Sequence, residues 1–128
     1  MAITPSDWIP TLALDLDGTI TDALIFFNVL SNYWPGTVVV ITFRKDRKKA
    51  EADLLAHNIR FDEVILVDSL EEKAKVIQER GFGIMFDDQD ESLQGISPDR
   101  AVFKIRNGGN FDYDTQQWLY SDRTGRRI

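Results

Sequence analysis

Short apolar runs alternate with longer amphipathic segments along this sequence. The apolar runs predict five β-strands, at residues 11–15, 37–42, 63–67, 82–87 and 101–105. The runs TVVVIT and EVILV are apolar at consecutive positions, which is typical of strands that are buried on both faces. The segments between them predict helices at residues 22–34, 44–58, 69–80, 90–94 and 113–120. The alternation predicts an α/β fold, a doubly wound, five-stranded parallel sheet sandwiched by helices.

Polar side chains stand where three of the predicted strands end. The first strand ends at Asp15, with Asp17 close behind; the second ends at Thr42, and the fourth ends at the pair Asp87 and Asp88. In open parallel sheets, ligands bind beyond the carboxyl ends of the strands. Neighbouring carboxylates raise each other's proton affinity unless a cation compensates them, and the simplest such cation is a hard divalent ion with oxygen ligands. We therefore expect a functional site at this edge.

Length and composition narrow the class of protein. The 128 residues fit a single domain, residues 1–128, and the absence of cysteine excludes disulfides and thiolate metal sites. The net charge of −6 argues against general binding to nucleic acids or anionic membranes. No apolar run is long enough to span a membrane, and the first residues lack the pattern of a signal peptide. We expect a soluble, cytoplasmic protein.

Four segments together resemble the motifs of a known family. DLDGT (15–19) after an apolar strand, VVVIT (38–42), Lys73 early in a helix, and GIMFDDQDES (83–92) resemble the four motifs of the haloacid dehalogenase superfamily of phosphotransferases. They occur in the family's order and extend over residues 11 to 92. Four motifs in order are more specific than any one of them.

The resemblance implies roles for the acidic residues. Asp15 would be the nucleophile that attacks phosphorus and becomes a phosphoaspartate. Asp17 would protonate the leaving group and then activate water. Mg²⁺ would be held by Asp15, the backbone carbonyl of Asp17, and Asp88, with Asp87 nearby; which of Asp87 and Asp88 is the main ligand stays open.

Cationic and hydroxyl residues would hold the phosphate. The resemblance assigns Thr42 and Lys73 to the phosphoryl oxygens, although Lys75 lies on the same predicted helix and competes with Lys73 for this role. The basic run RKDRKK (44–49) follows Thr42, so Arg44 is close enough to touch the substrate. A solvated charged face is the alternative explanation for the rest of this run.

The spacing of the motifs also predicts an open site. Only one helix separates Asp17 from the strand at 37–42, so the chain has no room for the cap domain that many family members insert there. That helix, residues 22–34, is apolar on nearly every side, which predicts either a homo-oligomer interface or burial beneath the C-terminal segment. In that segment we expect a structural role for Phe111 and Trp118 and assign none to the arginines Arg123, Arg126 and Arg127.

The leading functional hypothesis is a Mg²⁺-dependent phosphomonoester hydrolase acting on a small phosphorylated substrate. A nucleotide or polynucleotide end phosphatase is a related alternative, because the basic run could follow a nucleic-acid backbone. A phosphoacceptor signalling domain of the receiver type is an alternative from another class, with Asp68 after the third strand as its acceptor. A non-catalytic phosphate-binding module is the last alternative.

Overall fold

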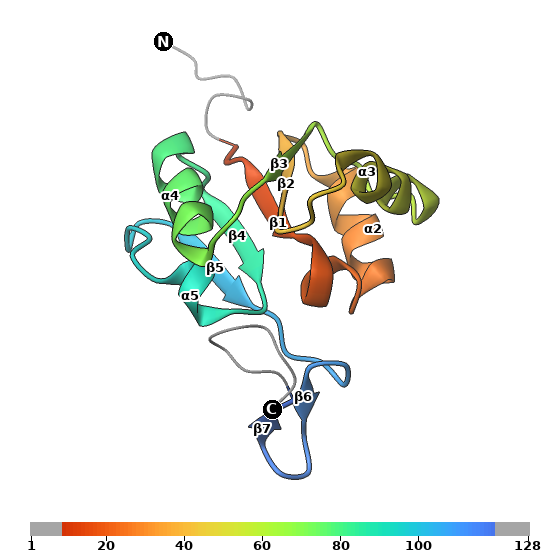
Figure 1. Cartoon of the computed structure of the whole chain (residues 1–128), viewed down its shortest axis with the longest axis vertical. Helices are drawn as coiled ribbons and strands as arrows, with labels where there is room; N and C mark the ends of the chain where they lie inside the picture. The colour runs from red at the N-terminus through yellow and green to blue at the C-terminus, as the bar shows by residue number, and fades with distance from the viewer. Residues whose placement is uncertain (1–8, 120–128) are drawn as a thin grey trace.

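The fold is built on one parallel sheet. The structure is a computed structural model and describes residues 9–119. Five strands pair in the order β3-β2-β1-β4-β5, and every pairing is parallel (Figure 1). Their bounds are β1 Leu12–Asp15, β2 Val38–Thr42, β3 Glu63–Leu66, β4 Ile84–Asp87 and β5 Ala101–Lys104. The predicted five-stranded parallel sheet is therefore confirmed, and the architecture is that of a Rossmann-like α/β fold.

Helices cover both faces of the sheet. Helices α2 and α3 lie on one face, and α4 and α5 lie on the other (Figure 1). Their bounds are α2 Leu24–Tyr33, α3 Arg47–Ala56, α4 Leu70–Arg80 and α5 Asp90–Leu93. Within residues 9–119, no helix has the length and apolar character needed to cross a membrane.

Alternation along the central strands divides the core into two halves. Leu12 and Leu14 of β1 face the α2–α3 side, where they join Phe27 and Leu54, whereas Ala13 faces the α4–α5 side. Both faces are fully buried, which explains why the strands are apolar at consecutive positions. Leu14 pairs with Phe86 of β4, so the next residues of the two strands reach the carboxyl edge at the same level.

Helix α4 begins at a well-defined N-terminal cap. The Ser69 hydroxyl accepts a hydrogen bond from the Glu72 backbone N–H at 3.0 Å, and the Glu72 carboxylate accepts one from the Asp68 N–H at 2.9 Å. Such reciprocal bonds satisfy donors that the first turn of a helix leaves without partners. Gly81 ends the helix in the left-handed conformation. The cap places Lys73 in the first turn, next to the carboxyl edge of the sheet.

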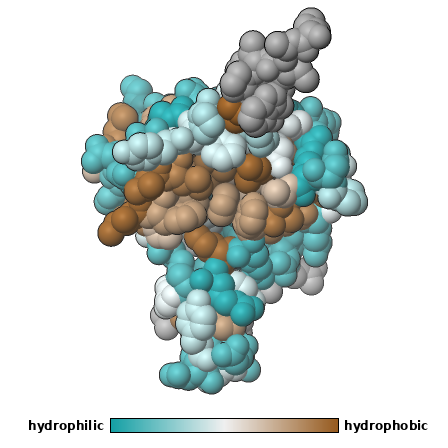
Figure 2. All heavy atoms as spheres, turned by 180° about the vertical axis from the view of Figure 1, so that it is seen from behind, coloured by the Kyte–Doolittle hydropathy of each residue, from teal (hydrophilic) through white to brown (hydrophobic). Residues whose placement is uncertain are grey.

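One face of α2 remains exposed in the described part of the chain. Ile25, Val29 and Tyr33, four residues apart on one side of the helix, are 84%, 51% and 82% exposed. Figure 2 shows an apolar band across the side of the molecule that lies behind Figure 1. The apolar composition of this helix is thus explained only on its inner side, at Phe27. A subunit interface on the outer side stays a prediction, and the native mass in solution is the measurement that tests it.

The helix predicted at residues 113–120 is wrong. Strands β6 (Phe111–Asp112) and β7 (Gln117–Trp118) form an antiparallel hairpin instead. The Asp112 carboxylate accepts hydrogen bonds from two backbone N–H groups of the loop, those of residues 114 and 115, and such bonds favour a turn over a helix. The Phe111 and Trp118 rings pack edge to face, 4.9 Å apart, in the structural role expected of them. Arg123, Arg126 and Arg127 lie outside the described residues.

Candidate functional site

The end of β1 and the turn that follows it place two acidic side chains in different surroundings. In the irregular turn η1 (Leu16–Ile20), Asp17 is extended and Gly18 has a φ of 84°. The Thr19 hydroxyl donates a hydrogen bond of 2.9 Å to Asp15 Oδ2, which holds the Asp15 carboxylate inward. The Asp15 side chain is 5% exposed and that of Asp17 is 58% exposed. One acid is therefore part of the interior, and the other faces solvent.

A buried lysine joins the ends of β1 and β4. Lys73 Nζ lies 2.5 Å from Asp15 Oδ1 and 2.8 Å from Asp87 Oδ2, and its side chain is completely buried. The ring of Phe43 covers the ammonium group, with its centroid 4.8 Å from Nζ. Lys75, the competing residue, is exposed and lies 3.8 Å from Glu79 on its own helix. Of the two lysines, only Lys73 belongs to the site.

Three carboxylates meet beside this lysine. Asp15, Asp87 and Asp88, called here the acidic cluster, each present an oxygen within 4.8 Å of the others. The Asp88 carboxylate lies against Gly18, where a Cβ atom would overlap it. When all three carboxylates are ionised, they and the one ammonium carry an excess of two negative charges, and the ligands are all oxygen. This set of ligands and charges fits a divalent cation such as Mg²⁺. Both Asp87 and Asp88 belong to the cluster, so the choice of main ligand between them stays open.

Two members of the acidic cluster, Asp15 and Asp88, hold protons more tightly than ordinary carboxylates do. Burial and the negative charge of Asp87 raise the pKa of Asp15 to about 6. Burial and the negative charge of Asp15 raise the pKa of Asp88 to about 9. Burial would lower the pKa of Lys73, but the charges of Asp15 and Asp87 outweigh it and raise that pKa. The lysine is therefore always charged, and without a cation the carboxylates are not all ionised at neutral pH.

Arg44 binds the exposed acid, Asp17. Arg44 Nε lies 2.9 Å from Asp17 Oδ2, and Nη2 lies 2.7 Å from Asp17 Oδ1. Nη1 of the same guanidinium lies 2.5 Å from Asp53 Oδ2 of α3. The hydrogen bond to Asp17 raises the pKa of Arg44 further above its usual value, and the bond from Arg44 lowers the pKa of Asp53. Arg44, which we expected to contact the substrate, therefore holds the side chain of Asp17, the expected acid–base residue.

Thr42 occupies the predicted place at the end of β2. It is 1% exposed, and its hydroxyl accepts a hydrogen bond of 3.1 Å from the backbone N–H of Arg44. This bond directs the chain after the strand, so that the Arg44 side chain reaches Asp17. Five of the predicted site residues lie at one edge of the sheet: Asp15, Thr42, Lys73, Asp87 and Asp88. The Asp17 carboxylate lies outside the acidic cluster.

Three contributors were not predicted as site residues. Thr19 is part of the DLDGT segment, and its position four residues after Asp15 is the signal that could have identified it. Phe43 follows the last residue of β2, but nothing in its local sequence points to Lys73. Asp53 is one acid among several charged residues on α3, so its bond to Arg44 depends entirely on tertiary structure.

Comparisons with known proteins assign this chain to no family. The sequence matches no protein-family model and no curated protein. The haloacid dehalogenase resemblance therefore rests on the four motifs, and the activity that it implies is a proposal.

The contact between Gly18 and Asp88 leads to a prediction about cation binding. Gly18→Ala would place a Cβ atom against the Asp88 carboxylate and displace it, so we expect Mg²⁺ to bind about tenfold more weakly or worse. Gly81→Ala is the matched control, because Gly81 also has a positive φ, of 70°, but no atom lies within 4 Å of its Cβ position. Both variants should lose about 1–2 kcal/mol of unfolding free energy from backbone strain. Equal Mg²⁺ affinity in the two variants, measured by calorimetry, would contradict the contact.

The raised carboxylate pKa values predict how cation binding depends on pH. Asp88 has a folded-state pKa of about 9 against an ordinary 3.8, so the folded chain retains a proton that the unfolded chain releases. Without a cation, stability should therefore fall as the pH rises from about 4 towards 9. A divalent cation must displace this proton. At pH values below the pKa of Asp88, the apparent Kd of the cation should therefore fall about tenfold for each unit by which the pH rises.

Calorimetry in buffers of different ionisation enthalpy would count the protons released when Mg²⁺ binds. Asp88→Asn should flatten the pH dependence of the affinity, because the amide carries no titrating proton. An affinity that does not change between pH 6 and pH 8 in the unaltered protein would refute the assignment.

Proposed function

We propose that this protein is a Mg²⁺-dependent phosphomonoester hydrolase that works through a phosphoaspartate at Asp15, with the architecture of a capless member of the haloacid dehalogenase superfamily. The observation that carries the proposal is the buried Asp15 carboxylate at the end of β1, held by Lys73 and Thr19 beside Asp87. A carboxylate attacks an anionic phosphate only where cationic groups cancel their repulsion, and Lys73 supplies one such charge.

The proposed reaction has two steps. An Asp15 oxygen attacks phosphorus, the ester P–O bond breaks, and Asp17 gives its proton to the departing alkoxide. Asp17 then takes a proton from the water that attacks the phosphorus of the acyl phosphate, which releases inorganic phosphate and restores Asp15. Mg²⁺ held by Asp15, Asp88 and the Asp17 carbonyl, with Asp87 nearby, would neutralise charge on the phosphoryl oxygens. Thr42 and Lys73 would hold those oxygens in place.

In the proposed reaction, Arg44 would control Asp17 as well as bind the substrate. Its two hydrogen bonds to Asp17 occupy both oxygens of that carboxylate, which must be free to exchange a proton in this reaction. A substrate phosphate offers the guanidinium the same two-oxygen geometry as a carboxylate. The incoming phosphate would therefore compete for Arg44 and release Asp17 to take up and transfer a proton.

The alternative hypotheses receive unequal support. A surface hollow next to the site is lined by three cations of the basic run, Arg44, Lys45 and Lys49, and by two acids, Asp46 and Asp53. The excess of one positive charge favours the nucleotide or polynucleotide end phosphatase as the second candidate. Receiver domains have the strand order 2-1-3-4-5, which differs from the order here. Asp68, the acceptor that a receiver would need, is 84% exposed and lies beside Lys45 instead. A phosphate-binding module without catalysis differs from the proposed phosphatase only in releasing no phosphate, so an activity assay distinguishes the two.

The nucleophile assignment predicts the effect of one substitution. Asp15→Asn should abolish release of phosphate from a generic aryl phosphate in Mg²⁺, because the amide is too weak a nucleophile to form the intermediate. Intact-protein mass spectrometry after acid quenching should detect one added phosphoryl group on the unaltered chain and none on the variant. Activity that survives in a folded Asp15→Asn protein would exclude the assigned nucleophile.

The assignment of Arg44 predicts a change in KM. Arg44→Ala should raise KM about tenfold, since a charge-assisted hydrogen bond contributes about 1.5–3 kcal/mol, and should weaken the dependence of kcat/KM on salt. Lys48→Ala is the matched control, because Lys48 belongs to the same basic run but is fully on the exposed side of α3. If both variants give the same kinetics at low and high salt, Arg44 does not contact the substrate.

A further inference from the structure

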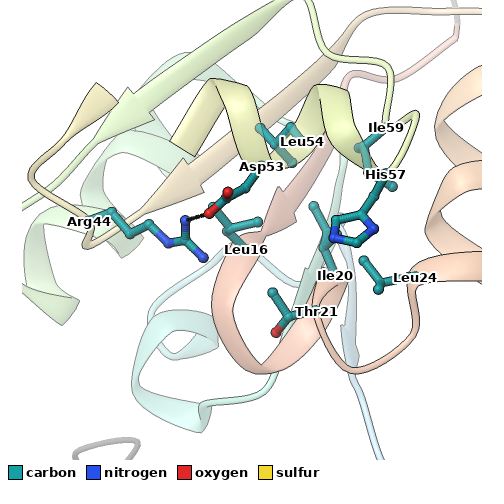
Figure 3. Close-up of a pocket in the computed structure, with 9 residues that line it drawn as sticks. All are labelled: Leu16, Ile20, Thr21, Leu24, Arg44, Asp53, Leu54, His57 and Ile59. Carbon is teal, nitrogen blue, oxygen red and sulfur yellow. Dashed lines mark hydrogen bonds and ion pairs between the residues drawn. The ribbon is translucent and has the colours of Figure 1, made fainter. Parts of the chain in front are cut away.

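A cavity adjoins Arg44, the residue that binds Asp17. It has a volume of about 220 Å³ and lies between α3 and the turn η1. Figure 3 shows Arg44 and its bond to Asp53 at one end and His57 at the other, with Leu54 on α3 and Ile20 on η1 between them. None of the roles assigned above uses this cavity.

The proposed reaction requires space for the leaving group near Asp17, and the cavity could provide it. Asp17 must reach the oxygen of the leaving group, so the body of that group has to lie on the Asp17 side of the phosphorus. Leu16 precedes Asp17 in η1 and, like Ile20 of the same turn, forms part of the wall of the cavity. Arg44 both binds Asp17 and lines the cavity. A leaving group that extends from Asp17 past Arg44 would therefore enter this space.

Leucine and isoleucine side chains form most of the walls, and Thr21, Arg44, Asp53 and His57 supply the polar part of the lining. Leu16, Ile20, Leu54 and Ile59 are each 2% exposed or less and offer the occupant no side-chain hydrogen bonds. A hydroxyl-rich sugar would lose much of its hydration against these four side chains. An aromatic ring, in contrast, gains from the apolar walls and stacks well on guanidinium and imidazole groups, which Arg44 and His57 provide.

We infer that this cavity, called here the ring pocket, is a binding subsite for an aromatic ring on the alcohol portion of a phosphate monoester. The inference rests on the proposed function and specifies its substrate class, which includes arylalkyl and nucleoside monophosphates. A second hollow shares Leu24 and His57 with the ring pocket, so the groove continues beyond the imidazole and leaves room for substituents on the ring.

The test compares two phosphonates in the presence of Mg²⁺. In 1-naphthylmethylphosphonate and methylphosphonate a carbon replaces the ester oxygen, so neither compound is hydrolysed. The ring pocket predicts that the naphthyl compound binds about tenfold tighter or better, from the apolar area that its ring buries. His57 is the only histidine in the chain, so its imidazole gives a single assignable NMR signal in an untagged protein. The naphthyl compound should shift this signal and methylphosphonate should not.

Two variants test whether the preference for the naphthyl compound arises in the ring pocket. Leu24→Asp replaces part of the pocket wall with a charge, and an acid in the first turn of α2 is compatible with the helix. This variant should bring the affinity ratio of the two phosphonates close to one. Leu55→Asp introduces the same change at a residue of α3 that is 64% exposed, and it should keep the ratio.

The outcomes separate the subsite from the proposed function. Equal affinities for the two phosphonates, with an unmoved His57 signal in the unaltered protein, overturn the ring pocket even if Asp15-dependent phosphatase activity is present. A naphthyl preference that Leu24→Asp abolishes, together with a shifted His57 signal, supports the subsite even if no phosphate ester is hydrolysed. In that case only the proposed function fails. The NMR measurement needs no variant, so it decides the question if Leu24→Asp does not fold.

Discussion

The ion pair between Lys73 and Asp15 is the interaction on which the rest of the site depends. A fully buried ammonium is tolerated only with anionic partners close by, and removing one partner of a buried pair typically destabilises a protein by about 3–5 kcal/mol. Lys73 meets this condition through Asp15 and Asp87, which come from two neighbouring strands. The pair therefore requires β1 and β4 to run in parallel with their ends level, and it requires the first turn of α4 at the same edge.

The sheet could be predicted from the sequence because its strands are apolar on both faces. Runs such as VVVI are stable only between two layers, and alternation with helical segments leaves a parallel sheet as the simple solution. The prediction failed in the tail, where Asp112 forms turn hydrogen bonds and Gln116 adopts a positive φ. Local side-chain-to-backbone bonds of that kind compete with a helix, and a pattern of apolar positions does not report them. The failure is therefore a failure of local turn chemistry and not of the overall architecture.

The site residues that stand at strand ends could be predicted from the sequence. The contacts that depend on how a helix packs against the sheet could not. Asp15, Thr42, Asp87 and Asp88 share an edge because parallel strands end together, so sequence position was enough to bring them close. The first-turn position of Lys73 followed from the Ser69 cap. The contact of Asp53 with Arg44 depends instead on how α3 lies against η1, and no local pattern encodes that. Arg44 was expected near the phosphate, but its pairing with Asp17 emerges only from the folded chain.

The two faces of the sheet contribute different chemistry to the proposed reaction. Lys73 belongs to α4, and in the proposed reaction it would balance the charge of the phosphoryl group. Arg44 and Asp53 belong to the α3 side, where they hold Asp17 and border the ring pocket. Asp15 stands between them because β1 is the strand at which the order of the sheet reverses direction. A substrate bound across this point would have its phosphate on one half and its leaving group on the other. Changes in α3 could then alter the choice of leaving group without disturbing the buried charges around Asp15.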